Sequence, residues 1–373
     1  MKYKYKKQLT KIKRIFQNLG DFKYLIVNKK VNQSGLLLVI HESQELGASI
    51  LALHIAEELK YQGVDVYIVS RQFGVMNEKY NKVAPIQIAL TTRSYEGICH
   101  NLYKKGYRKA LMITASNGDL VKITKKCGFK VVSMIHELEQ VIKMLHLEDA
   151  TRDMLVYSDK ILFSTSIAKN QILSLCKVCD SQKISIKPQG TYLKKPSSEE
   201  IKRQREKITK AYPVLDCGKK VIAGVGNTTE RKGFDIFLQT AALIPECEFL
   251  WAGKKENYYD EAIEKNGNPS NFIFLGSLNA EQLSGLYSLA DIYLMCSRFD
   301  TLPSTILEAL LFGTPVIGAK NSGGIVDIID SDNGFLTETA DSKQFAEAIK
   351  EGLTRNYKIE EIDGSFAEYV AYV

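Results

Sequence analysis

The sequence lacks several features that would place it in a membrane-spanning or disulfide-rich class. It has no apolar run that approaches the roughly 20 residues needed to span a bilayer. Its Lys-rich N-terminus lacks the apolar core of a signal peptide, so nothing in the sequence predicts export. Its seven cysteines are an odd number scattered along a long chain, which favours reduced thiols in the cytoplasm over a disulfide framework.

Metal-binding signals are also scarce. Cys176 and Cys179 form a CxxC pair, but no second pair and no nearby histidine completes a zinc site, so we expect incidental thiols there. What is present is a chain of 373 residues with 45% apolar and 25% charged residues. This balance is typical of a soluble globular protein, and the length suffices for two domains.

The net charge of +7 is concentrated at the start of the chain. The first 18 residues hold seven Lys or Arg and no acidic residue, and apolar side chains recur there at helical spacing. A basic amphipathic helix over residues 1–20 is typical of a segment that lies on anionic lipid. The alternative is a leader that docks its apolar stripe on the body of the protein. We recognise no nucleic-acid-binding module, so no nucleic-acid partner is expected.

From residue 35 onward, apolar runs alternate with helical patterns. GLLLVI at 35–40 has the continuous apolar character of a parallel strand that is covered on both faces. Similar runs follow up to 160–165, and the rhythm restarts with KVIAGVG at 220–226. This alternation predicts an α/β protein with two doubly wound parallel sheets. In such sheets, ligands bind at the carboxyl ends of the strands.

The same rhythms predict the domain boundaries. The helix expected at 199–212 is charged nearly all round, with Ser197 and Glu200 spaced as a capping box, and we expect it to bridge two bodies. We assign a basic leader to 1–34, a Rossmann-like N-terminal domain to 35–198, a Rossmann-like C-terminal domain to 199–355, and a tail that could cross back to the N-terminal domain to 356–373.

A basic loop follows the first strand of the second domain. It contains Arg231, Lys232 and Gly233, immediately before a predicted helix. Gly233 lets the backbone turn and approach a ligand closely. The two cations suit a diphosphate leaving group, whose negative charge grows as its bond to a sugar breaks. The alternative is a solvated basic turn.

The second notable stretch is SRFDTLPSTILEALLFGTPV at 297–316, which follows the apolar run DIYLMC. Pro303 predicts the start of a helix, since proline is favoured at the first helical position. A helix start after a parallel strand binds anions, phosphate above all. Asp300 and Glu308 beside such a site suggest sugar hydroxyls as a further ligand. The alternative is that Asp300 caps the helix and Glu308 faces solvent.

Together these segments resemble the GT-B glycosyltransferases, and within them the retaining family 4 group. Lys232–Gly233 matches the family's Lys–Gly. Asp300 and Glu308 match its E-x7-E motif within LEALLFGTPVI, and GGIVDIIDSDNGFL at 323–336 matches the glycine-rich segment that follows. The chain departs from the family at Asp300, where Glu is usual, and at Asn227, where Arg is frequent and whose charge Arg231 could supply.

The resemblance implies roles for these residues and a fold of two Rossmann-like domains that face a central cleft. Glu308 would bind the ribose hydroxyls and Asp300 the hydroxyls of the donor sugar. Arg231 and Lys232 would hold the diphosphate, together with backbone N–H groups at the helix start. The remaining donor-binding residues expected at strand ends and at the helix start are Gly253, Lys254, Ser277, Leu278, Thr301, Leu302, Ser304 and Thr305.

The first domain resembles the family through two strand ends. HESQELGAS at 41–49 is similar to the family's glycine-rich loop near the donor phosphates, with Gly47 at the key position. SMIHE at 133–137 is similar to the element whose histidine points at the transferred sugar, which marks His136. A histidine after an apolar strand is more often structural, but its position at the strand end and the resemblance favour the sugar contact. His41 is a lower-ranked candidate.

We therefore expect a retaining glycosyltransferase that moves a sugar from a UDP- or GDP-sugar to a glycan or lipid-linked acceptor. The expected setting is bacterial surface polysaccharide or glycolipid synthesis in the cytoplasm, at the inner face of the cell membrane. No cofactor or metal is expected, because the cations and N–H groups supply the positive charge. The alternatives are a catalytically weak GT-B subunit that supports a partner transferase, and a GT-B epimerase or phosphorylase, for which we find no motif.

Overall fold

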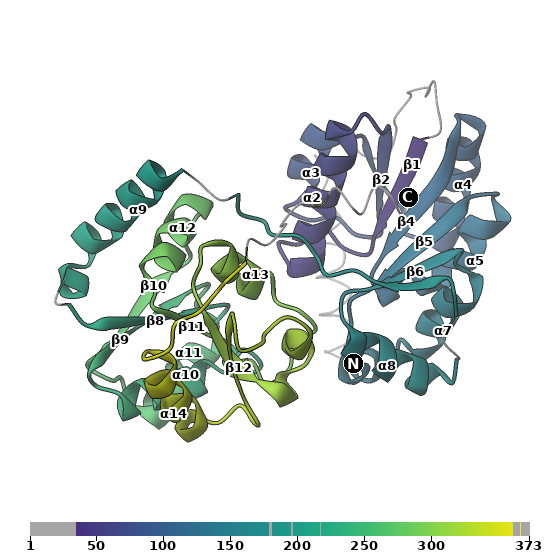
Figure 1. The fold of residues 1–373 in the computed structure, drawn as a ribbon. Helices are drawn as coiled ribbons and strands as arrows, with labels where there is room; N and C mark the ends of the chain where they lie inside the picture. The colour runs from purple at the N-terminus through teal and green to yellow at the C-terminus, as the bar shows by residue number, and fades with distance from the viewer. Residues whose placement is uncertain (1–34, 179–180, 195–196, 217, 361–365, 367–373) are drawn as a thin grey trace, which may run out of the picture. The chain divides into compact units, whose positions relative to one another are not determined.

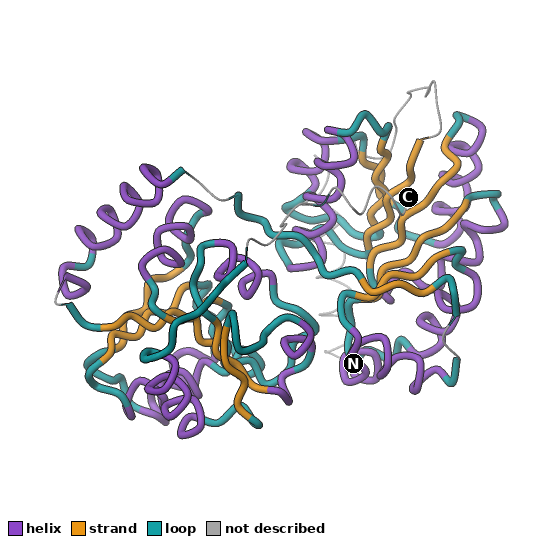
Figure 2. Tube along the Cα trace, viewed as in Figure 1, coloured by secondary structure: helices purple, strands orange, loops and turns teal. Residues whose placement is uncertain are grey.

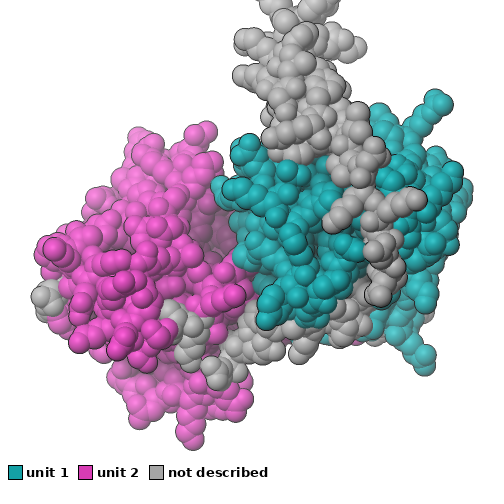
Figure 3. All heavy atoms as spheres, turned by 90° about the horizontal axis from the view of Figure 1, so that it is seen from above, with its two compact units in different colours: residues 1–163, 170–187, 366–373 teal, residues 164–169, 188–365 magenta. Residues whose placement is uncertain are grey.

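A computed structural model describes residues 35–178, 181–194, 197–216, 218–360 and 366. The predicted leader, most of the predicted tail and Cys179 lie outside the described residues. The described chain divides into two compact units, shown in Figure 3. Unit 1 comprises the described residues within 1–163 and 170–187 together with Phe366, and unit 2 comprises those within 164–169 and 188–365.

Unit 1 is built on a seven-stranded sheet in the order β3-β2-β1-β4-β5-β6-β7 (Figures 1 and 2). All neighbouring pairs are parallel. Every residue of β1 is buried, as its continuous apolar sequence predicts. The strands are β1 (Gly35–Ile40), β2 (Val66–Ser70), β3 (Ile86–Ile88), β4 (Tyr107–Ile113), β5 (Lys130–Ile135), β6 (Lys160–Phe163) and β7 (Ile184–Ile186).

Helices connect the successive strands of this sheet. Side-chain caps help to fix where these helices begin. For example, the Thr91 hydroxyl accepts a hydrogen bond from the Ser94 backbone N–H and caps the helix that follows β3. The helices are α2 (Gly47–Tyr61), α3 (Asn77–Val83), α4 (Thr92–Lys104), the 3-10 turn η2 (Ala115–Asn117), α5 (Gly118–Lys126), α6 (Glu139–Met144), α7 (Glu148–Tyr157) and α8 (Ser166–Cys176), whose first residues belong to unit 2.

Unit 2 repeats this architecture with a six-stranded sheet in the order β10-β9-β8-β11-β12-β13. These neighbours are also parallel. The strands are β8 (Lys220–Val225), β9 (Cys247–Ala252), β10 (Phe272–Gly276), β11 (Ile292–Leu294), β12 (Val316–Ala319) and β13 (Gly334–Thr337). The helices are α9 (Ser198–Ala211), α10 (Phe234–Leu243), α11 (Tyr258–Asn266), α12 (Ala280–Leu289), α13 (Ser304–Leu311) and α14 (Ser342–Gly352), with 3-10 turns at Pro213–Asp216, Lys320–Ser322 and Gly324–Asp327.

Unit 2 has one hydrophobic core on each face of its sheet. Because successive strand residues point to opposite faces, Ile222 of β8 packs in the core beneath α10, α11 and α14, while Val221 and Ala223 pack in the core beneath α9, α12 and α13. The predicted class, α/β with two doubly wound parallel sheets, is confirmed.

Two local expectations from the sequence differ from the structure. Helix α9 does not bridge two bodies: it packs along α12 within unit 2 and buries Gln204 and Ile208. Ser197 accepts from the Glu200 backbone N–H as predicted, but the Glu200 carboxylate accepts from Arg203 and Gln204 on the next turn.

The division between the units falls between residues 187 and 188, ahead of the expected position at 198. The segment that follows residue 187 is fixed to unit 2, because the Gln189 side chain donates to the Leu302 carbonyl at 2.7 Å and Leu193 packs in a core of that unit. At the other end of the chain, Phe366 stacks on His54 of α2, with ring centroids 5.8 Å apart.

Candidate active site

The strand order of unit 2 reverses between β8 and β11, which lie side by side at the centre of the sheet. The helices that follow two such strands cover opposite faces, so their loops separate and leave a crevice at the carboxyl edge. The loop after β8 carries Arg231 and Lys232, and the loop after β11 carries Asp300. The sheet topology therefore brings the two predicted loops to the same place.

Gly233 is the residue on which this approach depends. It lies in the left-handed region with φ of 70° and directly precedes α10. A Cβ atom at this position would lie 2.0 Å from the backbone oxygen of Cys296, two residues after the end of β11. Glycine is therefore required here for two reasons: the backbone is left-handed, and the two loops pack too closely for a Cβ atom.

Arg298 ties the two loops together. Its backbone N–H donates to the Arg231 carbonyl at 2.9 Å, and its guanidinium donates to the Glu230 carbonyl at 2.6 Å. The same guanidinium binds both oxygens of Asp235, at 2.8 and 2.7 Å. Burial would raise the pKa of Asp235, but the bonds and charge of Arg298 outweigh it and hold that pKa below its ordinary value.

Asp300 binds both predicted cations through one oxygen. Its Oδ2 atom lies 2.6 Å from Lys232 Nζ and 2.9 Å from Arg231 Nη1. Lys232 and Asp300 are largely buried, with side chains 17% and 15% exposed, whereas Arg231 is 44% exposed. Burial would raise the pKa of Asp300, but the two cations outweigh it and lower that pKa below its ordinary value. The group is therefore an ionised carboxylate at neutral pH.

Glu308 lies in a different electrostatic environment. It is 4% exposed within α13, and its Oε2 atom accepts a hydrogen bond from the Tyr287 hydroxyl at 2.9 Å. Burial raises its pKa to about 7, against the hydrogen bonds from Tyr287 and the Tyr192 backbone. The alternative in which Glu308 faces solvent is therefore wrong.

The glycine-rich segment after β12 braces the Asp300 loop. The Asp300 backbone N–H donates to the Ser322 carbonyl at 2.7 Å, and the Gly324 N–H donates to the Asp300 carbonyl at 3.2 Å. A Cβ atom on Gly324 would lie 1.9 Å from the Thr301 carbonyl oxygen. The segment at 323–336 that matched the family motif therefore begins with a backbone support for the loop that carries Asp300.

The start of α13 differs slightly from the expectation. The helix begins at Ser304, and Pro303 is the capping residue with an extended ψ of 131° rather than the first helical residue. Among the other residues expected here, Thr301 precedes this cap, the Leu302 carbonyl accepts from Gln189, and the Thr305 hydroxyl accepts from Tyr293 at 2.7 Å. In the first helical turn, the Ile306 N–H donates to the carbonyl of the capping residue Pro303 at 3.2 Å, whereas the N–H groups of Ser304 and Thr305 precede the first bond of the helix.

The remaining donor-binding candidates of unit 2 follow β9 and β10, beside the Arg231 loop. The Gly253 N–H donates to the Gly276 carbonyl at 2.8 Å, and the Lys254 carbonyl accepts from the Thr228 N–H at 3.0 Å. Ser277 is exposed and Leu278 packs against a core of the unit. These residues lie at the carboxyl edge, and their role at the nucleotide base stays a prediction.

Unit 1 holds the two candidates from the first domain. Gly47 is the first residue of α2 and is exposed, and a Cβ atom there would meet no atom within 4 Å. Steric packing within the described chain therefore does not require a glycine at this position. His136 follows β5; its Nε2 atom is buried without a hydrogen-bond partner among the described residues, and burial lowers its pKa to about 4. It is therefore a neutral imidazole at physiological pH.

Glu137 and His41 lie at the same strand edge of unit 1. The Glu137 carboxylate accepts from the backbone N–H groups of Ala115 and His136, both at 3.0 Å, and burial raises its pKa to about 7. His41 is 3.0 Å from both the Thr114 hydroxyl and the Glu42 carboxylate. Glu137 thus links the ends of β4 and β5 through hydrogen bonds. Glu137 is not among the candidates predicted from the sequence, in which its only signal is its position next to His136.

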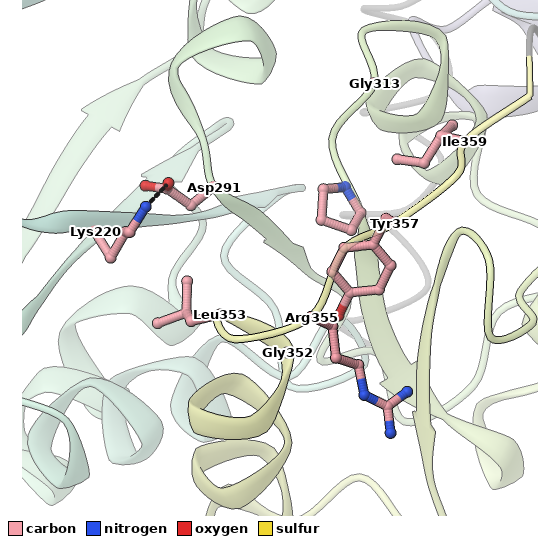
Figure 4. A pocket seen from close by; sticks show the side chains of 9 residues that line it. Lys220, Asp291, Gly313, Gly352, Leu353, Arg355, Tyr357 and Ile359 are labelled. Carbon is pink, nitrogen blue, oxygen red and sulfur yellow. Dashed lines mark hydrogen bonds and ion pairs between the residues drawn. The ribbon is translucent and has the colours of Figure 1, made fainter.

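A separate pocket of about 420 Å³ lies at the opposite edge of the sheet of unit 2 (Figure 4). Lys220, at the start of β8, and Asp291, just before β11, line it and form an ion pair of 2.7 Å. Asp291 also accepts from the Val221 N–H at 2.8 Å. Since none of the predicted site residues lines it, the pocket is distinct from the candidate active site.

Comparisons with known proteins find similarity to glycosyltransferases. Residues 205–365 match the family described as glycosyl transferases group 1. Alpha-galactosylglucosyldiacylglycerol synthase of Streptococcus pneumoniae is 33% identical over 103 residues, 26% of this chain and 28% of that protein. D-inositol 3-phosphate glycosyltransferase of Mycolicibacterium smegmatis is 27% identical over 207 residues, 53% of this chain and 46% of that protein. The matched regions thus span less than half of each of these relatives.

Solved structures extend the likeness to nearly the whole chain. Anabaena HepE in complex with UDP and glucose has a TM-score of 0.72 and 16% identity, over 91% of this chain and 95% of that one. WaaG, a glycosyltransferase involved in lipopolysaccharide biosynthesis, has a TM-score of 0.65 and 17% identity, over 86% and 90%. At these identities the likeness shows the fold, that of the GT-B glycosyltransferases. The match to the family described as glycosyl transferases group 1 covers less than half of the chain and falls within unit 2.

Proposed function

We propose that this protein is a retaining glycosyltransferase of family 4 type, which moves a sugar from a nucleoside-diphosphate sugar to a hydroxyl group of an acceptor. The observation that carries the proposal is the cluster of Asp300, Lys232 and Arg231 at the strand-order reversal of unit 2. Two cations held by a carboxylate beside a helix start suit a ligand that is both a diphosphate and a polyol.

The proposed roles divide the donor among the clustered residues. Lys232 and Arg231 bind the diphosphate, together with the backbone N–H groups of Thr301, Leu302, Ser304 and Thr305. Asp300 accepts hydrogen bonds from the donor sugar, and Glu308 accepts them from the ribose. His136 contacts the transferred sugar, and the loop at Gly47 lies near the donor phosphates. Gly253, Lys254, Ser277 and Leu278 frame the base.

The proposed reaction needs no nucleophile from the protein. The bond between the anomeric carbon and the diphosphate oxygen breaks, and the electron pair stays with that oxygen. The acceptor oxygen forms its bond on the same face, so the configuration is retained, and the acceptor proton passes to the leaving phosphate. Lys232 and Arg231 stabilise the negative charge that develops there, a contribution that does not require a metal ion.

The donor and acceptor classes are also proposals. We propose a UDP- or GDP-sugar as donor; HepE, with the same fold, is described with UDP, which makes UDP-sugars the first to test. We propose a glycan or lipid-linked acceptor, in bacterial surface polysaccharide or glycolipid synthesis. The names of relatives that act on diacylglycerol lipids and on lipopolysaccharide core support this class.

The test uses the full-length protein with a panel of UDP- and GDP-sugars, and measures donor hydrolysis and transfer to diacylglycerol and glycosyl-diacylglycerol acceptors. We expect one donor to be turned over, with the anomeric configuration of the product unchanged by NMR. No hydrolysis or transfer with any donor would overturn the proposed activity. If saturable UDP binding accompanied that result, it would favour the accessory-subunit alternative.

We further propose a peripheral contact with the inner face of the cell membrane through residues 1–20. No helix of the described chain is long and apolar enough to cross a bilayer. The seven basic and no acidic residues among the first 18 support a contact with anionic lipid. Flotation with anionic liposomes should recover the full-length protein and lose the form without residues 1–20. Equal recovery of both forms would rule out this role.

A further inference from the structure

Two buried tyrosines donate hydrogen bonds to side chains of α13. Tyr287 of α12 and Tyr293 of β11 are both buried, with ring centroids 5.9 Å apart. The Tyr287 hydroxyl donates to Glu308 Oε2 at 2.9 Å, and the Tyr293 hydroxyl donates to Thr305 Oγ1 at 2.7 Å. Each tyrosine therefore orients a different residue of the helix that we propose to bind the nucleotide.

The bond to Glu308 leaves part of the carboxylate available. An ionised carboxylate can accept about four hydrogen bonds. Tyr287 supplies one, and the Tyr192 backbone N–H supplies another. When donors from the described residues are counted, about two acceptor positions remain, which is the number that the 2′ and 3′ hydroxyl groups of one ribose would use.

Tyr287 itself is held in place by its surroundings. Its ring stacks on Phe312, with centroids 6.0 Å apart, and its backbone carbonyl accepts from the Thr314 hydroxyl at 2.6 Å. A buried ring fixed at both ends cannot swing its hydroxyl to another partner without disturbing the core. The position of the hydroxyl therefore sets the position of the Glu308 carboxylate.

We propose that Tyr287 is a positioning residue for ribose recognition: its hydroxyl fixes the Glu308 carboxylate so that the free lone pairs accept the 2′ and 3′ hydroxyls of the nucleotide. This inference rests on the proposed function, which assigns Glu308 to the ribose. It adds a residue outside the E-x7-E motif, on a different helix, whose effect reaches the ligand through Glu308.

The electrostatic surroundings of Glu308 support this role. Within the described part of the chain, the titratable groups that face it are tyrosines: Tyr287 on α12, Tyr293 on β11 and Tyr192 in the segment before α9. Burial raises the pKa of all three, so they are neutral near pH 7. Since burial already raises the Glu308 pKa to about 7, loss of the Tyr287 bond should raise it further and reduce the ionised fraction at neutral pH.

The test compares full-length wild-type protein and Y287F in binding of UDP and of 2′,3′-dideoxy-UDP. Y287F should weaken UDP binding about five-fold at pH 7, the scale of one hydrogen bond, and leave dideoxy-UDP binding unchanged. Y293F is the matched control, because it removes an equally buried hydroxyl of the same aromatic pair that bonds to Thr305 instead. Any effect of Y293F should be the same for both nucleotides.

The pH dependence of UDP binding distinguishes loss of the Tyr287 hydrogen bond from general structural damage. Structural damage alone would not shift the pH midpoint of the dissociation constant. The wild-type dissociation constant for UDP should rise as pH falls through about 7, and in Y287F the midpoint should move to higher pH. An equal loss of affinity for both nucleotides in Y287F, or an unshifted midpoint, would overturn the inference.

E308Q separates the inference from the proposed function. If E308Q loses the preference for UDP over dideoxy-UDP while Y287F keeps it, Glu308 binds the ribose and the role of Tyr287 is wrong. If neither wild type nor E308Q distinguishes the two nucleotides, the assignment of Glu308 to the ribose fails, and the inference fails with it.

Discussion

The Lys232 ammonium lies 2.6 Å from Asp300 Oδ2, and that oxygen also binds Arg231 at 2.9 Å. The two cations proposed to bind the diphosphate are thus neutralised in part by the carboxylate proposed to bind the sugar. The carboxylate and the diphosphate would therefore compete for the same two cations. The five predictions below concern these residues, Glu308 with its raised pKa, the glycine between the two loops, and divalent metal.

Substitution of either Lys232 or Glu308 by alanine should lower donor turnover by at least ~100-fold, the scale for loss of one charge-stabilising contact. Steady-state transfer with the donor identified from the panel measures this. K320A is the control, since Lys320 is a half-exposed cation of the same unit that pairs with Glu338 outside the site. Near-normal transfer by both site variants would contradict the assignment.

D300N should separate nucleotide binding from transfer. The substitution removes a negative charge that competes for Lys232 and Arg231, so UDP, which has no sugar, should bind as tightly as before or more tightly. Transfer from the UDP-sugar should fall ~100-fold because a contact to the donor sugar is lost. Calorimetry and steady-state kinetics measure the two effects. A large loss of UDP affinity would show that Asp300 organises the cations rather than competing for them.

Glu308 should make the protein less stable as pH rises. Its pKa in the folded state is raised from 4.5 to about 7, so the folded state holds its proton more tightly than the unfolded state. The resulting penalty appears as pH rises through about 4.5 to 7 and is complete above 7, at no more than ~3 kcal/mol. E308Q should therefore gain stability over the wild type at pH 8 and much less at pH 5, as measured by urea unfolding. A difference that does not depend on pH would contradict this.

G233A should disrupt the site more than a backbone-strain penalty explains. An alanine here would adopt a left-handed backbone and place Cβ 2.0 Å from the Cys296 carbonyl oxygen. G313A is the matched control, because Gly313 has a φ of 76° but no atom within 4 Å of an added Cβ. Both should lose the ~1–2 kcal/mol of a left-handed residue. We expect G233A to lose more and to bind UDP more weakly, while G313A keeps wild-type affinity.

Removal of divalent metal should leave transfer unchanged. The proposed charge stabilisation comes from Lys232, Arg231 and the N–H groups at the start of α13. Assays with EDTA, with and without added Mg²⁺ or Mn²⁺, measure this. A transfer rate that falls with EDTA and returns with the metal would require a cation in the mechanism.

The alternation of apolar runs with helical patterns predicted the fold well. Continuous apolar strands such as 35–40 are a strong signal, and the restart at 220 places the second sheet. Boundaries were less predictable, because they depend on tertiary contacts. Residues 188–193 carry no pattern that assigns them to either domain, and it is the bond from Gln189 to Leu302 and the burial of Leu193 that join them to unit 2.

The sequence marked candidate residues at strand ends and in family motifs, but it gave no signal for the residues that hold these candidates in place. Lys232 and Asp300 meet because β8 and β11 are neighbours, which the expected sheet topology implies. Tyr287 and Arg298 instead bind side chains on other elements. Tyr287 donates to Glu308 of α13, and Arg298 donates to Asp235 of α10. In the sequence, Tyr287 is one apolar position of a helix and Arg298 one charge in a loop, and neither carries a signal of its partner.

The attachment of residues 188–193 to unit 2 has a consequence for building chimaeric transferases. Gln189 supports the loop before α13, and the Tyr192 backbone lowers the pKa of Glu308, so both would have to stay with unit 2, which we propose to bind the nucleotide. A hybrid joined after Ser197, before α9, would replace these two supports with foreign residues. A hybrid joined after Lys187 would keep both supports, and residues 164–169, which also belong to unit 2, would have to be kept with them.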